Sequence, residues 1–235
     1  MRERFVIIPA GGTGSRMGSE LPKQMHDLLG KPVLRRTAEL FMALPFKVGI
    51  IISINPSIKG MWLEYCKNNN FVFPHILISG GITRFHSVKK AMKYLPDGAL
   101  VAVHDGVRPL MKREDVVAAY AEAEDYPAVV PVLPVADSMR ELCDGNAGAG
   151  GVCVASHIVD RSRYRLVQTP QIFHTEVLKK AYEAAYSPEF TDDASVVEKS
   201  GVPLHFRAGS RFNIKLTTPE DMDLARAVLS SGLLK

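Results

Sequence analysis

The chain has 235 residues, of which 46% are hydrophobic and 23% are charged, the composition of an ordinary folded protein rather than a disordered one. A chain of this length can bury enough surface to be stable without disulfides or a structural metal. Its net charge of +4 suits anionic small molecules but is too small to indicate nucleic-acid binding. No apolar run approaches the roughly 18 residues of a membrane-spanning helix, so we expect no membrane partner.

The cysteines and the first residues predict a location. Cys66, Cys143 and Cys153 are an odd number, with no Cys-x-x-Cys pair and no Cys/His spacing typical of zinc, so neither a disulfide framework nor a structural metal site is indicated. The apolar run at residues 5–9 is too short for a signal peptide. We therefore expect a reducing compartment and a cytoplasmic protein.

Over the first 130 residues, short runs rich in β-branched residues alternate with segments of helical period. The predicted strands are 5–9, 48–53, 76–79, 100–104 and 128–132. The predicted helices between them are 33–44, 57–69, 84–95 and 113–125. This alternation predicts an α/β protein with a largely parallel sheet, whose ligand-binding loops lie at the carboxyl ends of the strands.

The pattern changes at Pro131. Residues 131–168 have no helical period and contain two predicted strands, 137–142 and 152–159, joined by a glycine-rich stretch. Helices at 176–186, 192–200 and 219–229 and a strand at 204–207 complete the prediction. No linker divides the chain, so we expect one domain over 1–235 with residues 131–168 as a protruding β-hairpin arm, although a floppy excursion is the alternative.

A glycine-rich segment follows the first predicted strand. Residues 12–17 read Gly-Thr-Gly-Ser-Arg-Met, which lacks the last glycine of a dinucleotide-binding Gly-x-Gly-x-x-Gly, and no Gly-Lys-Ser/Thr of a Walker A loop is present. What remains is a loop whose N–H groups can approach phosphate, with Arg16 and then Lys23 as cations. On the glycines alone, a tight turn with a surface arginine is an equal alternative.

Six further blocks make the interpretation specific. They are Leu-Pro-Lys-Gln at 21–24, Gly-Gly-Ile-Thr-Arg-Phe-His-Ser-Val at 80–88, His-Asp-Gly-Val-Arg-Pro at 104–109, Thr-Pro-Gln at 169–171, Thr-Asp-Asp-Ala-Ser at 191–195 and Asn-Ile-Lys at 213–215. Together with the glycine loop, the chain resembles the 2-C-methyl-D-erythritol 4-phosphate cytidylyltransferase family of sugar-phosphate nucleotidyltransferases over about residues 5–228.

The resemblance implies a fold and an assembly. The fold is a Rossmann-like three-layer α/β arrangement, with a mixed, mostly parallel sheet and helices on both faces. In the family, the arm crosses to a second subunit and completes its acceptor pocket. The resemblance therefore implies a homodimer formed through residues 131–168.

The implied reaction joins CTP to 2-C-methyl-D-erythritol 4-phosphate in the non-mevalonate route to isoprenoids. The acceptor phosphate attacks the α-phosphorus in line and pyrophosphate leaves. Because the nucleophile is already an anion, no general base is needed, and positioning and charge stabilisation are the protein's main tasks. The resemblance also implies Mg²⁺ as the divalent cation.

The resemblance assigns roles to particular residues. The residues implied in catalysis are Arg16, Lys23 and Lys215. Those implied in nucleotide binding are Ala10, Gly11, Gly12, Thr13, Gly14, Gly81, Ser87, Asp105 and Gly106. Those implied in acceptor binding are Arg108, Ser138, Arg161, Thr169 and Thr191, and the metal ligand is Asp105.

Two positions depart from the family's pattern. Ile82 stands where some relatives carry an acidic residue, which weakens any ribose contact through that side chain, whereas Ser138 replaces a common threonine and keeps its hydroxyl. His104, Trp62 and the three cysteines have no evident chemical partner in the sequence and are interpreted as packing or surface residues.

Three other functions were weighed. Cytidylyl transfer to ribitol 5-phosphate is the nearest, and the 191–195 block and the segment 159–161 favour the methylerythritol acceptor over it. A non-catalytic nucleotide-binding regulatory protein would have little use for both Lys23 and Lys215. A dinucleotide-dependent oxidoreductase is disfavoured by the glycine spacing.

Overall fold

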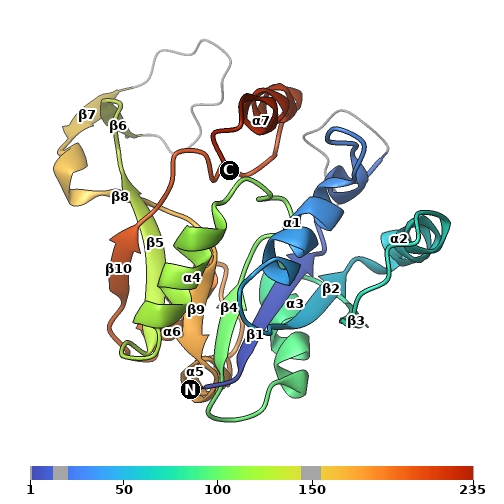
Figure 1. The fold of residues 1–235 in the computed structure, drawn as a ribbon. Helices are drawn as coiled ribbons and strands as arrows, with labels where there is room; N and C mark the ends of the chain where they lie inside the picture. Colours follow the sequence, from blue (N-terminus) through green and yellow to red (C-terminus); the bar gives the residue numbers. More distant parts are fainter. Residues whose placement is uncertain (1, 13–20, 144–154, 235) are drawn as a thin grey trace.

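The computed structural model describes residues 2–12, 21–143 and 155–234. Within these ranges an eight-stranded sheet runs through the molecule in the order β10-β5-β9-β4-β1-β2-β3, with β8 paired to β5 (Figure 1). Its strands are β1 (Arg4–Ala10), β2 (Gly49–Ile54), β3 (Ile76–Ser79), β4 (Leu100–Val103), β5 (Ala128–Pro134), β8 (Arg165–Val167), β9 (Gln171–His174) and β10 (His205–Ala208).

The sheet is mixed but mostly parallel. β4, β1, β2 and β3 run parallel to one another, and so do β5 and β10, whereas β9 lies antiparallel between β4 and β5. Since β9 is reversed, its first residue, Gln171, pairs with Val103 at the end of β4. The start of β9 therefore reaches the sheet edge at which the parallel strands end.

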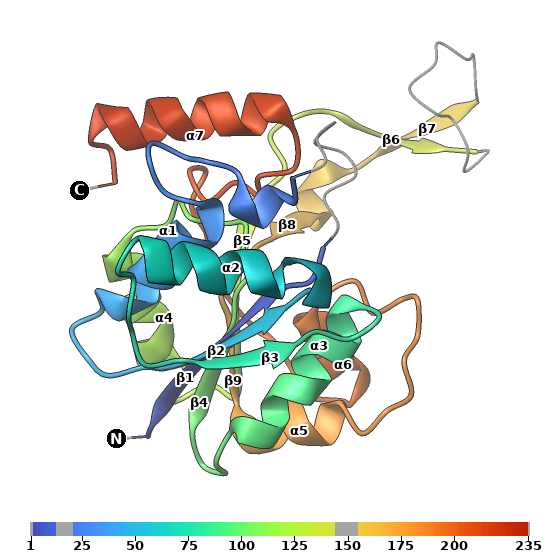
Figure 2. The ribbon, with the colours of Figure 1, turned by 90° about the vertical axis from the view of Figure 1, so that its right-hand side faces the viewer.

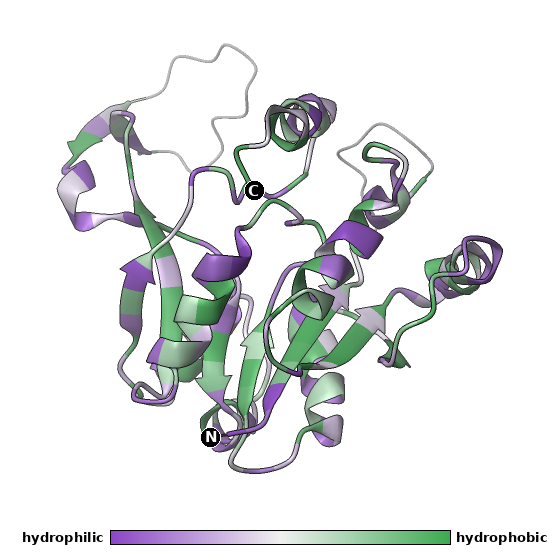
Figure 3. Cartoon of the chain, in the orientation of Figure 1, coloured by the Kyte–Doolittle hydropathy of each residue, from purple (hydrophilic) through white to green (hydrophobic). Residues whose placement is uncertain are grey.

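Helices cover both faces of the sheet, because alternate residues of each buried strand point to opposite sides. Val6 and Ile8 of β1 belong to one buried cluster, which includes residues of α1 (Val33–Met42), α2 (Pro56–Asn68) and α4 (Arg113–Glu122). Ile7 belongs to the other, with α3 (Arg84–Ala91), α5 (Thr175–Ala181) and α6 (Asp193–Lys199). Figure 3 shows the hydrophobic strands in the middle of this three-layer arrangement. The expected Rossmann-like α/β fold is confirmed.

The helix nearest the C-terminus, α7 (Pro219–Ser231), packs on a third, smaller cluster that includes Leu28 and Leu216. Its first turn is set locally: Thr218 and Asp221 form a reciprocal capping box, and Pro219 occupies the first helical position. α7 thereby anchors the segment that carries Lys215.

A two-stranded hairpin extends from the body. β6 (Met139–Leu142) and β7 (Ser156–Val159) pair antiparallel in a sheet of their own and project away from the central sheet, as Figure 2 shows. The two ends of the 131–168 range lie in or beside β5 and β8 of the central sheet. Ile158, in the projecting part, is 82% exposed. The glycine-rich connection at 144–151 lies outside the described residues.

The sequence prediction missed β8 and β9. The four residues of β9 include only two apolar side chains, Ile172 and Phe173, too few for a clear strand pattern. Several helices end earlier than predicted, most clearly α3, which gives way after Ala91 to a 3-10 turn, η3 (Met92–Tyr94), and α5, which ends at Ala181. Among the described helices, none is both long enough and apolar enough to span a bilayer.

Candidate active site

The predicted site residues gather where chain segments leave one edge of the sheet. Gly11 follows β1, Gly81 follows β3 and Asp105 follows β4. Thr169 precedes the reversed strand β9, and Lys215 lies on the segment between β10 and α7. Parallel strands commonly place their ligand loops at this edge, and the reversal of β9 adds one more loop to it.

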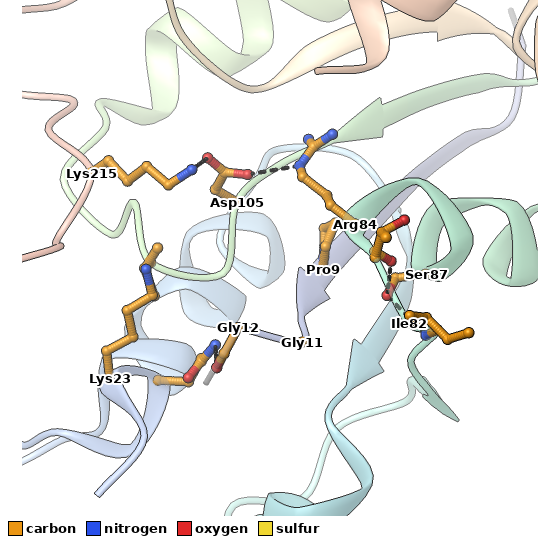
Figure 4. Close-up of a pocket in the computed structure, with 13 residues that line it drawn as sticks. Pro9, Gly11, Gly12, Lys23, Ile82, Arg84, Ser87, Asp105 and Lys215 are labelled. Atoms are coloured by element: carbon orange, nitrogen blue, oxygen red, sulfur yellow. Dashed lines mark hydrogen bonds and ion pairs between the residues drawn. The ribbon is translucent and has the colours of Figure 1, made fainter. Parts of the chain in front are cut away.

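The first cavity lies between Gly11 and Gly12, which follow β1, the start of α3, and Lys215. It has a volume of about 330 Å³ (Figure 4). Among the described residues, its lining includes three cationic side chains, Lys23, Arg84 and Lys215, and a single carboxylate, Asp105. The remaining lining residues are Pro9, Gly11, Gly12, Gln24, Gly81, Ile82, Thr83, Ser87 and Val107. Cations beside exposed glycine backbone are suited to a polyanion.

A second cavity, of about 230 Å³, shares three residues with the first: Arg84, Asp105 and Lys215. Its other lining residues are Arg108, Val167, Gln168, Thr169, Gln171, Thr191 and Asp192. The two cavities therefore adjoin at a wall made of two cations and one carboxylate. We call Arg84, Asp105 and Lys215 the shared wall.

Asp105 is the centre of this wall. Its Oδ1 accepts from Arg84 Nε at 3.2 Å, and its Oδ2 lies 3.1 Å from Lys215 Nζ and 3.3 Å from Arg108 Nε. Burial alone would raise the pKa of Asp105, but the charges of Arg84, Lys215 and Arg108 outweigh burial and hold that pKa well below its usual range. Asp105 is consequently an anion at any physiological pH.

His104 is connected to Asp105 through the hydroxyl of Thr169. It is buried, which lowers its pKa to about 4, so the ring is neutral near pH 7. Its Nε2 lies 2.9 Å from the Arg108 carbonyl, so Nε2 carries the proton, and Nδ1 then accepts from the Thr169 hydroxyl at 3.1 Å. That hydroxyl in turn accepts the Asp105 N–H at 3.1 Å. His104, interpreted from the sequence as a packing or surface residue, is buried, and it also orients Thr169 and, through it, Asp105.

Asn213 fixes the segment that carries Lys215. The Asn213 side chain is fully buried, and its Nδ2 donates to the Thr169 carbonyl at 2.7 Å. The main-chain carbonyl of Asn213 accepts from Arg108 Nη1 at 2.8 Å and from Gln168 Nε2 at 3.2 Å. These contacts join the Lys215 segment to both the β4 and the β9 loops.

The turn after β3 is shaped by Gly81 and Ser87. Gly81 N–H donates to Ser87 Oγ at 3.0 Å, and Ser87 Oγ donates to the Thr83 carbonyl at 3.0 Å. A Cβ on Gly81 would overlap the His86 Cβ and lie 2.7 Å from the His86 carbonyl carbon, closer than side chains ever come. Only glycine lets this turn lie against the start of α3.

Most predicted residues within the described ranges line a cavity. The first cavity contains Gly11, Gly12, Lys23, Gly81, Ser87, Asp105 and Lys215, and the second contains Asp105, Arg108, Thr169, Thr191 and Lys215. Ala10 and Gly106 are buried beneath the site and line neither cavity. Thr13, Gly14 and Arg16 lie outside the described residues.

Ser138 and Arg161 lie on the arm rather than at the cavities of their own chain. Both are exposed, and the Arg161 guanidinium donates to the Ala136 carbonyl within the arm. The chain thus keeps these two predicted acceptor residues away from its own shared wall.

Four residues outside the predicted set also line the cavities or hold residues that line them: Arg84, Gln171, Asp193 and Asn213. All four lie inside the sequence blocks that carry the resemblance, so the blocks were the available signal. Their contacts are with other protein groups, however, and no spacing in the sequence discloses such partners.

Comparison with known proteins agrees with this geometry. A family model described as 2-C-methyl-D-erythritol 4-phosphate cytidylyltransferase matches residues 5–231. A protein of that name from Bacteroides thetaiotaomicron is 45% identical over 97% of this chain and 100% of its own length.

Solved structures agree as well. The crystal structure of 2-C-methyl-D-erythritol 4-phosphate cytidylyltransferase from Thermus thermophilus superposes with a TM-score of 0.73 at 27% identity, covering 98% of this chain and 100% of that one. The enzyme of the same name from Francisella tularensis superposes with a TM-score of 0.76 at 27% identity, covering 96% and 99%.

The Gly81 turn generates a prediction with a matched control. Gly81→Ala should destabilise the protein by about 1–3 kcal/mol and weaken nucleotide binding, because the added Cβ forces the turn away from α3. Gly60→Ala, in α2, has nothing within 4 Å of its added Cβ and should stabilise the protein by up to about 1 kcal/mol. Chemical denaturation and CTP titration measure both effects. Equal stability of the two variants would contradict this account of the turn.

Proposed function

Because the chain belongs to the 2-C-methyl-D-erythritol 4-phosphate cytidylyltransferase family, we propose that its two adjoining cavities hold the two substrates of that enzyme. The protein is a nucleotidyltransferase that transfers the cytidylyl group of CTP to 2-C-methyl-D-erythritol 4-phosphate, with release of pyrophosphate, in non-mevalonate isoprenoid synthesis. The relatives do not favour the ribitol acceptor or a non-catalytic role. The observation that supports our assignment of substrates is the shared wall between the cavities.

In the proposed arrangement, CTP occupies the first cavity. Lys23 contacts the triphosphate, the backbone at Gly11 and Gly12 approaches it, and the turn at Gly81 and Ser87 receives the cytidine portion. The triphosphate is a polyanion, and Lys23, Arg84 and Lys215 around this cavity offset its charge. Arg16, assigned to the same task, lies outside the described residues.

The acceptor occupies the second cavity, where Arg108 and the loops at Thr169 and Thr191 surround it. A phosphate oxygen of the acceptor forms a bond to the α-phosphorus of CTP, and the bond from that phosphorus to the oxygen it shares with the β-phosphate breaks, releasing pyrophosphate. Lys215 belongs to both cavities, so its ammonium is placed to stabilise negative charge as the two substrates react.

The hydrogen bonds of the Thr169 hydroxyl constrain its role. Its proton is donated to His104 and its oxygen accepts the Asp105 N–H. Thr169 therefore has no second proton to offer an acceptor phosphate, and we assign it to orienting Asp105 at the cavity edge. Within the same chain, Arg108 and Thr191 remain as the candidates for direct contact with the acceptor.

A divalent cation, Mg²⁺ in our proposal, fits the residues present. Asp105 is ionised and is the only carboxylate lining the first cavity among the described residues, which form no group of three metal-ligating side chains. Mg²⁺ is commonly held by one or two carboxylates together with substrate phosphates, and such a site needs no protein cage. When bound, the ion would neutralise phosphate charge, with Asp105 as its protein ligand.

We also propose a homodimer in which the arm, residues 131–168, places Ser138 and Arg161 in the acceptor cavity of the partner subunit. The support is that both residues are exposed and lie outside the cavities of their own chain. The projecting hairpin also exposes apolar side chains such as Ile158 and Leu142, which an interface would bury. A cytoplasmic location remains a prediction from the cysteines, the short apolar run at residues 5–9 and the lack of a long apolar run in the sequence.

The substrate assignment predicts the acceptor preference. With Mg²⁺ and CTP, pyrophosphate release should depend on 2-C-methyl-D-erythritol 4-phosphate and be at least about a hundredfold slower with ribitol 5-phosphate, because a site built around one polar acceptor leaves groups unpaired with another. A coupled pyrophosphate assay with both acceptors measures this. Turnover with ribitol 5-phosphate alone would overturn the assignment.

Lys215→Ala and Lys23→Ala should each lower kcat by about a hundredfold or more, because each removes a charge placed at the reacting phosphates. Lys179→Ala is the matched control, since Lys179 also forms an ion pair, with Asp97 at 2.6 Å, but lines neither cavity. Steady-state kinetics on folded variants decides. A Lys215→Ala enzyme as active as the Lys179→Ala control would rule out the proposed role.

Sharing of the arm predicts complementation between two inactive variants. When Arg161→Ala and Lys215→Ala chains are mixed and exchanged, about a quarter of wild-type activity should return, because about half of the dimers would be mixed and each would hold one intact site. Mixing each variant with itself is the control. No recovery in dimers shown to be mixed would mean that Arg161 does not serve the partner.

A further inference from the structure

Arg84 connects the shared wall to a carboxylate that lies outside both cavities. Its Nε donates to Asp105 Oδ1 at 3.2 Å, and its Nη2 donates to Asp193 Oδ2 at 2.6 Å. Asp193 is fully buried and lines neither cavity. Asp105 and Asp193 therefore both accept hydrogen bonds from the same guanidinium, one from Nε and the other from Nη2.

Asp193 has a second partner behind it. Tyr182 is 1% exposed, and its hydroxyl donates to Asp193 Oδ1 at 2.5 Å. Burial and the Asp193 charge raise the pKa of Tyr182, so the phenol keeps the proton that it donates. The ring of Tyr182 stacks on Phe85, the neighbour of Arg84, with centroids 4.5 Å apart. The line Tyr182–Asp193–Arg84–Asp105 is thus fixed at its buried end.

Stability alone does not account for such a line. Replacing a buried carboxylate and its cation together by well-packed apolar groups is often neutral or stabilising, because burying two charges costs much of what their attraction returns. The planar guanidinium does, however, impose a geometry that a point charge does not. The line is better explained by what it holds in place.

The line joins the walls of the two cavities. Arg84 is the first residue of α3, directly after the turn that lines the first cavity, and Asp193 is the first residue of α6, two residues after Thr191 of the second. Gln171 fixes the same end of α6: its Nε2 donates to Asp192 Oδ2 at 2.8 Å, and its Oε1 accepts the Ala194 N–H at 2.8 Å. Arg84 is the link from this clamped loop to Asp105.

We propose that Asp193 is a positioning residue that holds the guanidinium of Arg84 in the shared wall, and thereby sets the loop at Thr191 against Asp105. This proposal deepens the substrate assignment made above and rests on it. Without the Asp193 charge, Arg84 keeps one counterion, Asp105, and is free to move toward it or toward bound phosphate. The two substrates are then no longer held in line, which slows the reaction more than it weakens binding.

The test is Asp193→Asn, assayed with Mg²⁺, CTP and the methylerythritol phosphate. We expect kcat to fall about tenfold or more. The KM for CTP should change by less than about threefold, because the Asp193 side chain bonds to Arg84 and Tyr182 and does not line the CTP cavity. Glu122→Gln, which breaks the ion pair with Arg207 away from both cavities, is the control and should leave kcat unchanged.

The double variant Arg84→Gln/Asp193→Asn separates positioning from stability. Because it removes both charges, its Tm should recover relative to Asp193→Asn, whereas its kcat should stay low. Arg84→Lys keeps the charge but not the two separate N–H donors, Nε and Nη2, that contact the two carboxylates, and its kcat should also be low. A kcat equal to that of the wild-type protein in folded Asp193→Asn, in the double variant or in Arg84→Lys would overturn the proposal. If Asp193→Asn does not fold, Arg84→Lys is the variant that decides. If the wild-type protein itself were inactive with both acceptors, the substrate assignment would be contradicted instead.

Discussion

The site depends on one buried carboxylate that faces three cations. Asp105 pairs with Arg84 at the start of α3, with Arg108 after β4, and with Lys215 between β10 and α7. A buried charge is tolerated only when it is paired, so folding that buries Asp105 must also bring these cations together. The same contacts leave a net positive wall between two cavities, which is the requirement for joining two phosphorylated substrates that repel each other.

The scaffold serves this wall through the order of its strands. β1, β3 and β4 end at one edge, and the reversed strand β9 brings Thr169 and Gln171 to the same edge. Asn213 then ties the Lys215 segment to these loops, and His104 sets the hydroxyl of Thr169. These buried neutral groups place the charged residues in advance, so that binding a polyanion does not require the protein to build its site first.

Sequence analysis predicted the fold class, most helices and the parallel strands, because those elements carry strong hydrophobic periods. It missed β9, whose burial depends on its position between β4 and β5 rather than on its own four residues. It predicted Asp105, Lys23 and Lys215 as site residues through the motifs that contain them, but it did not predict the contacts of Asp193 or Asn213. Those partners lie far away along the chain, as with Arg84 and Asp193, and tertiary packing alone brings them together.

We propose that the two substrates meet at the wall formed by Arg84, Asp105 and Lys215. The most direct measurement is a crystal structure of the protein with Mg²⁺, a non-hydrolysable CTP analogue and the acceptor. The account predicts the α-phosphate beside Lys215 in the first cavity and the acceptor phosphate beside Arg108 in the second. An acceptor bound away from Arg108 and Lys215, or a triphosphate outside the first cavity, would contradict it.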